Sequence, residues 1–77
     1  MPPKSKPQAM VRLGAVLRAR REALGISQEE AARLSKLHRN YIGGVERAER
    51  NCTILSLAKL AEALGTTPSE VLREAGL

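Results

Sequence analysis

Two short helices joined by a tight turn are predicted by residues 27–51, SQEEAARLSKLHRNYIGGVERAERN. Residues 27–30 form a capping box, in which the serine side chain accepts from the amide three residues on while the glutamate reaches back. Residues 35–37 supply the turn, and the second helix covers about Arg39 to Arg47. That helix is polar at its start and apolar on one face, so we expect it to project toward a partner.

The net charge of +5 is concentrated in the same part of the chain. Residues 1–50 hold 11 lysines and arginines against 5 glutamates, a balance of +6, whereas residues 51–77 carry a balance of −1. This division would fit a protein that binds a polyanion through residues 1–50 and a protein partner through residues 51–77. Tyr41 is the only aromatic residue. The core must therefore be aliphatic, and the base stacking used in single-strand and RNA recognition lacks its usual side chains.

Length and composition exclude several classes of protein. The 77 residues predict one small domain, of a size that often gains stability by dimerising. No apolar run approaches the roughly 18 residues of a membrane-spanning helix, and the first residues lack a signal peptide's apolar stretch. A single cysteine, Cys52, fits a reducing compartment. We expect a cytoplasmic protein with no membrane partner, a disordered basic arm at residues 1–8 and a folded domain at residues 9–77.

Capping signals and apolar periodicity predict an all-α protein, a compact five-helix bundle. Ser27, Thr53 and Thr67 are suited to N-caps, and Gly25 and Gly65 to helix ends. No strand pattern is present. The helices are expected at about Ala9 to Leu24, after Ser27, at about Arg39 to Arg47, after Thr53 and after Thr67.

The apolar periodicity also assigns a buried face to the helices. The inward residues are expected to be Met10, Leu13, Val16, Leu17 and Leu24, then Ala31, Ala32 and Leu34, then Leu37, Ile42 and Val45, then Ile54, Leu57, Ala58, Ala61 and Leu64, while the last helix carries Val71, Leu72 and Leu77. Arg39, Asn40, Gly43 and Gly44 are expected to face outward.

Catalytic and metal chemistry find little support in these residues. The chain has one histidine, one cysteine and no aspartate, and His38 with Cys52 falls short of the three or four ligands of a metal site. No nucleophile and base with an orienting third group can be identified. The two glycines at residues 43–44 lie inside a helix and not between a strand and a helix, so they do not form a glycine-rich phosphate-binding loop. We expect no enzyme activity and no cofactor.

The front of the second short helix carries side chains suited to reading base edges. A major groove admits one α-helix, whose first residues reach the bases. Arg39 can present two donors to guanine, and Asn40 can pair with adenine through two hydrogen bonds. A solvated helix face is the alternative for such residues. Gly43 and Gly44 favour DNA binding, because each mid-helix glycine costs about 0.5–1 kcal/mol and two together indicate a steric reason.

Candidate phosphate contacts flank this helix on both sides. Gln28 lies in the first turn of the preceding helix, where its side chain and the free amides would form a phosphate clamp. Arg47, Arg50 and Asn51 follow the reading helix and would contact the DNA backbone on the other side. Solvent exposure without a ligand is the alternative for each of them.

The chain from Leu13 to Leu72 resembles the Xre/Cro-type helix-turn-helix family, which includes phage repressors. Residues 39–47, RNYIGGVER, followed by residues 50–54, RNCTI, are especially similar to controller proteins of restriction–modification systems. Those are small cytoplasmic dimers that regulate transcription of their own and the endonuclease genes. The resemblance implies a lambda-repressor-like DNA-binding domain and a transcriptional regulator.

The resemblance also implies a role for each matching residue. Gln28 matches a phosphate-contacting glutamine, Arg39 and Asn40 match base-reading positions, and Gly43 matches a groove-facing position. Positions that contact DNA in controller-like members are matched by Tyr41, Arg50 and Asn51. Arg21 and Glu46 match a partly buried ion pair between the first and third helices.

Three residues depart from the family's pattern. His38 stands where a small N-cap such as serine or aspartate is preferred, and Gly43 replaces a residue that is often serine. Ala48 stands where glycine commonly ends the third helix. If the backbone is left-handed there, alanine costs about 1 kcal/mol.

The sequence as a whole predicts a homodimeric, sequence-specific regulator that binds double-stranded DNA. Two-fold symmetry would require a palindromic operator with half-sites about one helical turn apart, and the last two helices are the expected dimer interface. RNA polymerase is a further candidate partner. The alternatives are an antitoxin, which binds DNA and also masks a toxin, and a helical protein-interaction module without DNA binding.

Overall fold

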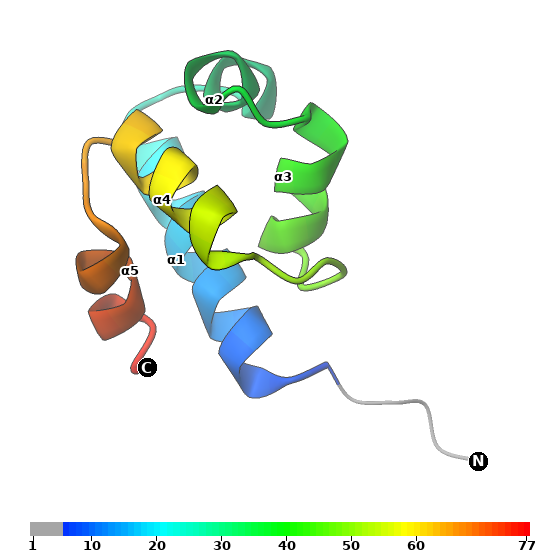
Figure 1. The fold of residues 1–77 in the computed structure, drawn as a ribbon, viewed down its shortest axis with the longest axis vertical. Helices are drawn as coiled ribbons and strands as arrows, with labels where there is room; N and C mark the ends of the chain where they lie inside the picture. Colours follow the sequence, from blue (N-terminus) through cyan, green and yellow to red (C-terminus); the bar gives the residue numbers. More distant parts are fainter. Residues whose placement is uncertain (1–5) are drawn as a thin grey trace.

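The computed structural model describes residues 6–77, which form five α-helices around one aliphatic core (Figure 1). The helices are α1 (Gln8–Ala23), α2 (Gln28–Ser35), α3 (Arg39–Glu46), α4 (Ile54–Ala63) and α5 (Pro68–Glu74). No strand occurs in this part of the chain. The prediction of an all-α five-helix bundle is therefore confirmed. Of the predicted arm, residues 1–5 lie outside the described residues, and Gln8 is already the first residue of α1.

Three hydroxyl side chains cap the helices as the sequence predicts. Each accepts from the backbone amide three residues on, Ser27 from Glu30 at 3.0 Å, Thr53 from Ser56 at 3.0 Å and Thr67 from Glu70 at 3.2 Å. The return half of the predicted capping box is wrong, because the Glu30 carboxylate instead accepts from the Arg33 guanidinium one turn further along α2. That contact lowers the pKa of the Glu30 carboxyl group.

The core lies between the five helices, each of which contributes at least one buried side chain, and α4 packs against α2. α3 packs against α1 and α2, and α5 packs against α1 and α4 (Figure 1). The buried residues that make one cluster are Leu13, Leu17, Ala31, Ile42, Val45, Leu57, Leu60, Ala61, Leu64 and Val71. All are aliphatic, as expected of a chain with a single aromatic residue. Only Leu60, which is 2 % exposed, was not among the predicted inward residues.

Three leucines and isoleucines predicted to be buried are exposed. Leu24, Leu34 and Ile54 keep 54 %, 45 % and 75 % of their surface accessible. Leu24 is the C-cap of α1 and Ile54 is the first residue of α4, so both lie at helix ends. Periodicity identifies the apolar side of a helix, but the bundle covers only the part of that side that another helix reaches.

A close approach between α1 and the end of α3 depends on Gly14, whose role the sequence did not predict. A Cβ at this position would lie 2.4 Å from the carbonyl oxygen of Val45 and 2.7 Å from that of Glu46. Real Cβ atoms do not come that near to backbone oxygens. The absence of a side chain at Gly14 therefore sets how closely the two helices can pack.

Within residues 6–77, two residues other than glycine have a left-handed backbone. Lys36, the C-cap of α2, has φ 60°, and Ala48, in the turn after α3, has φ 59°. The Ala48 backbone is thus left-handed, the case in which the sequence assigned a cost to alanine. Such a backbone costs an L-residue roughly 1 kcal/mol relative to glycine.

Glycine at position 36 is expected to raise the free energy of unfolding by about 0.5–1 kcal/mol, because Lys36 is exposed and loses little packing. Urea unfolding of Lys36→Gly measures this gain. Ala48→Gly should gain less, because the Ala48 side chain is only 5 % exposed and its methyl group packs. A Lys36→Gly protein less stable than the parent would contradict the strain assigned here.

None of the helices within residues 6–77 is long and apolar enough to cross a membrane.

Candidate nucleic-acid interface

The predicted site residues lie on the first turn of α2, on α3 and on the loop after α3. Arg39, Asn40, Arg47, Arg50 and Asn51 are exposed, as a surface that contacts a ligand requires. Some of the predicted site residues fall into two groups. Gln28 and Arg47 meet over Gly43, and a shared hollow is lined by His38, Asn40, Tyr41 and Arg50.

His38 replaces the expected small N-cap of α3 without loss of the capping bond. Its extended backbone, φ −71° and ψ 137°, is that of an N-cap, and its Nδ1 accepts from the Asn40 amide at 3.1 Å. The imidazole nitrogen does here what a serine hydroxyl does at the start of α2. An accepting Nδ1 requires the neutral ring with its proton on Nε2. The cap therefore orients the imidazole at the front of α3, beside Asn40.

The Tyr41 hydroxyl fixes the loop that leads to α4. It donates to the Asn51 carbonyl oxygen at 2.8 Å and accepts from the Thr53 amide at 3.3 Å. Cys52 lies between these two contacts, half-buried, and burial raises the pKa of its thiol above the ordinary range. The phenol thus sets the position of the Asn51 backbone and limits where its side chain can reach.

The glycine pair in α3 is buried, which corrects the prediction that it faces outward. Long side chains cover both residues. A Cβ at Gly43 would lie 2.9 Å from Nη1 of Arg47 and 3.2 Å from Oε1 of Gln28. A Cβ at Gly44 would lie 2.4 Å from Cγ of Arg50. The pair therefore makes room for side chains of this chain. A steric reason for two glycines exists, as the sequence indicated, but it is the packing of the protein's own side chains.

Gly44 also anchors the loop through its backbone. Its carbonyl oxygen accepts from the amide of Glu49 at 2.7 Å and from that of Arg50 at 3.2 Å. Together with the missing side chain, these bonds place the stem of Arg50 against α3. Arg50 also lines the hollow that Tyr41 lines.

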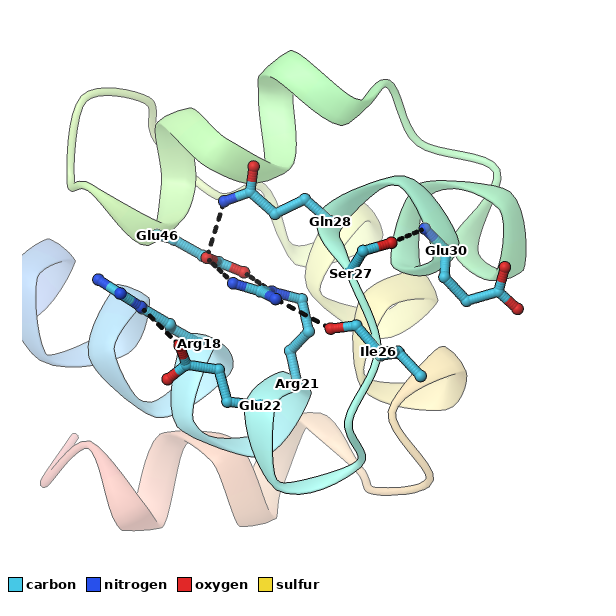
Figure 2. A network of polar contacts seen from close by, with 8 residues as sticks. All are labelled: Arg18, Arg21, Glu22, Ile26, Ser27, Gln28, Glu30 and Glu46. Atoms are coloured by element: carbon cyan, nitrogen blue, oxygen red, sulfur yellow. Dashed lines mark hydrogen bonds and ion pairs between the residues drawn. The ribbon is translucent and has the colours of Figure 1, made fainter.

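A buried ion pair joins α1 to the end of α3 (Figure 2). Nε and Nη2 of Arg21 lie 2.7 Å and 3.0 Å from the two carboxylate oxygens of Glu46, whose side chain is 3 % exposed. Nη1 of Arg21 donates to the Ile26 carbonyl oxygen at 2.9 Å, and Nε2 of Gln28 donates to Oε1 of Glu46 at 3.0 Å. The hydrogen bond to Glu46 raises the pKa of Arg21. The pair implied by the resemblance is confirmed.

The same carboxylate constrains the Gln28 side chain, which was predicted to contact phosphate. One N–H of its Nε2 is used by Glu46, and its Oε1 lies against Gly43. An amide nitrogen carries two hydrogens, so Gln28 keeps a second donor. The bond to Glu46 gives that donor a defined direction at the start of α2 (Figure 2).

Sequence reasoning missed two further charged side chains at this surface. Nη1 of Arg39 lies 3.3 Å from Oε1 of Glu29 on α2, and Nζ of Lys6 donates to the Arg47 carbonyl oxygen at 2.7 Å. Both contacts join residues that a local pattern cannot relate, because they depend on how α2 and the start of the chain lie against α3. Among residues 6–77, no group of three histidine, cysteine or acidic side chains is arranged to hold a metal ion.

Comparison with known proteins extends these observations. A helix-turn-helix family model matches residues 17–71. The control protein C.SmaI of Serratia marcescens is 48 % identical over 61 residues, which cover 79 % of this chain and 73 % of that protein. The crystal structure of the restriction-modification controller protein C.AhdI from Aeromonas hydrophila matches with a TM-score of 0.78 and 48 % identity, covering 80 % of this chain and 94 % of that one. The clp gene regulator ClgR from Corynebacterium glutamicum matches with a TM-score of 0.86, 32 % identity and coverage of 94 % and 77 %.

Proposed function

Because this chain belongs to the Xre-type helix-turn-helix family of DNA-binding transcriptional regulators, we propose that it binds a palindromic operator as a homodimer in the cytoplasm. Each α3 enters the major groove of one half-site. One observation carries this proposal: Arg39 and Asn40 are adjacent and exposed at the front of α3. Long polar side chains and the N-terminal turn of α2 flank them.

The proposed roles follow from the chemistry of each side chain. Arg39 donates to guanine and Asn40 pairs with adenine, while Gly43 lets the helix and its covering side chains lie close to the groove. Phosphate contacts come from both flanks and set the register of the protein on the duplex. They are assigned to Gln28, Tyr41, Arg47, Arg50 and Asn51.

The proposed dimer interface lies on α4, α5 and the end of the chain. Ile54 and Leu55, 75 % and 67 % exposed, stand together at the start of α4, and Leu77 at the end of the described chain is 52 % exposed. Exposed apolar side chains of this size are typical of a surface that a second protein covers. Two-fold symmetry through α4 and α5 would place the two copies of α3 about one helical turn of DNA apart.

The names of the relatives indicate which genes such a protein regulates. C.SmaI is a control protein, and C.AhdI is a restriction-modification controller protein. We propose the same role for this chain, a regulator without catalytic activity that controls a restriction–modification operon. Regulation of that kind requires a contact with RNA polymerase or exclusion of it from the promoter.

Arg39→Ala is expected to weaken binding to the upstream region of the native operon about 5- to 150-fold, which corresponds to the roughly 1–3 kcal/mol of one bidentate base contact. Mobility shift with a salt titration measures this loss. The matched control is Arg73→Ala, which removes an exposed arginine of α5, 73 % accessible and paired with Glu70. Equal effects of the two substitutions would contradict the reading role of Arg39.

A further inference from the structure

Glu29 and Arg39 form an ion pair across the turn between α2 and α3. The atoms in contact are Oε1 of Glu29 and Nη1 of Arg39, 3.3 Å apart, and the side chains are 73 % and 59 % exposed. The pair belongs neither to the core nor to the buried network around Glu46. Its carboxylate follows Gln28 directly in the chain, at the edge of the proposed DNA-binding surface.

The geometry of the guanidinium gives this contact a consequence. A guanidinium presents five N–H groups in a planar fork. The contact with Glu29 engages Nη1. The Nε–Nη2 edge, which is a different edge of the same plane, stays available. That edge has two parallel donors, which match the O6 and N7 acceptors of guanine.

We propose that Glu29 is a positioning residue that makes Arg39 selective for guanine, an inference that rests on the function proposed above. By holding Nη1, the carboxylate restricts the rotamers of Arg39 and directs its Nε–Nη2 edge to a base. Its negative charge also competes with DNA phosphates for the same guanidinium. Arg39 thereby contributes less to sequence-independent binding and more to binding at sites where a guanine faces it.

This role predicts a change in selectivity and not simply in affinity. Glutamine at position 29 removes a negative charge near a polyanion, so binding to every duplex should become tighter. Arg39, no longer held, then reaches phosphates as readily as bases. Since an exposed ion pair contributes little, the preference for guanine is expected to fall about two- to fivefold.

The test uses the full chain and three duplexes of equal length. One is the upstream operator, one carries a single G·C to A·T change at the position where Arg39→Ala loses its preference, and one is scrambled. Kd is measured for the parent, Glu29→Gln, Arg39→Ala and the double variant. The matched control is Glu30→Gln, which makes the same charge change in the same turn of α2 at a carboxylate paired with Arg33 instead.

The expected result is a two- to fivefold lower operator-to-mutant ratio for Glu29→Gln, an unchanged ratio for Glu30→Gln, and no effect of Glu29→Gln on that ratio once Arg39 is alanine. A purely structural role of Glu29 would leave base preference unchanged. Equal ratio changes at positions 29 and 30, or a ratio change that persists without Arg39, would overturn the inference. If Arg39→Ala abolishes the preference and Glu29→Gln does not alter it, Glu29 alone is misassigned. If the parent shows no preference among the duplexes, the proposed function fails as well.

Discussion

Glu46→Ala is expected to lower the free energy of unfolding by about 3–5 kcal/mol, the cost of breaking a buried ion pair from one side. The substitution leaves the Arg21 guanidinium, whose side chain is 12 % exposed, without its counter-charge. It also removes the acceptor of the Gln28 amide. Because a domain of this size shifts its midpoint by roughly 4–8 °C per kcal/mol, thermal unfolding followed by circular dichroism should show a fall of roughly 12 °C or more.

The control for this prediction is the exposed pair between Arg20 on α1 and Glu74 on α5. That pair is also bidentate, with 3.0 Å and 2.5 Å contacts, but the two side chains are 28 % and 43 % exposed. Solvent-exposed ion pairs contribute about 0–1 kcal/mol, so Glu74→Ala should shift the midpoint by only a few degrees. Similar losses for Glu46→Ala and Glu74→Ala would show that burial of the first pair does not matter.

The pH dependence of the buried pair follows from the raised pKa of Arg21. A cation whose pKa is raised on folding contributes its full stability below the pKa that it has in the unfolded chain. The contribution is lost only when the pH rises through the still higher value in the folded state. The guanidinium therefore keeps its charge at every pH at which the protein would ordinarily be studied.

Gly14→Ala is expected to destabilise the fold by about 2–3 kcal/mol, although alanine is the better helix former by about 1 kcal/mol. The added methyl group would lie 2.4 Å from the Val45 carbonyl oxygen, which belongs to backbone and cannot rotate away. α1 and α3 would have to separate. Chemical denaturation at equilibrium measures the loss.

The matched control is the reverse exchange at the next position. Ala15 is exposed, so Ala15→Gly should lose only the helix propensity of alanine, about 1 kcal/mol. A Gly14→Ala protein as stable as the parent would show that α1 and α3 adjust to the added methyl group. Because Glu46 ends α3 at this contact, the same variant should also disturb its pairing with Arg21.

Local features of the fold could be predicted from the sequence because their causes are local. The N-caps at Ser27, Thr53 and Thr67 each depend on a hydroxyl and an amide three residues apart, and all three form. The glycine at position 14 could not be predicted. It lies within an ordinary helical pattern, and only the crossing of α1 and α3 gives it a purpose.

The candidate site likewise combines features that the local sequence predicts with features that depend on how the helices pack. The pattern of α3 identified Arg39 and Asn40 as exposed residues at its front, which the structure bears out. Gly43 and Gly44 were predicted to be exposed but are buried, because the ends of the Arg47 and Gln28 side chains cover Gly43 and the stem of Arg50 covers Gly44. Glu29 escaped notice, since its contact with Arg39 depends on the angle between two helices.

The Glu46 carboxylate also bears on how such a protein can change its target over evolutionary time. It ties α1, the first residue of α2 and the last residue of α3 to one another, so the two helices of the motif move as one body. Under the function proposed above, adaptation to a new operator would come from the DNA and from the long side chains at the front of α3. Substitutions there can redirect binding while the scaffold stays intact, which makes target choice and folding stability separately evolvable.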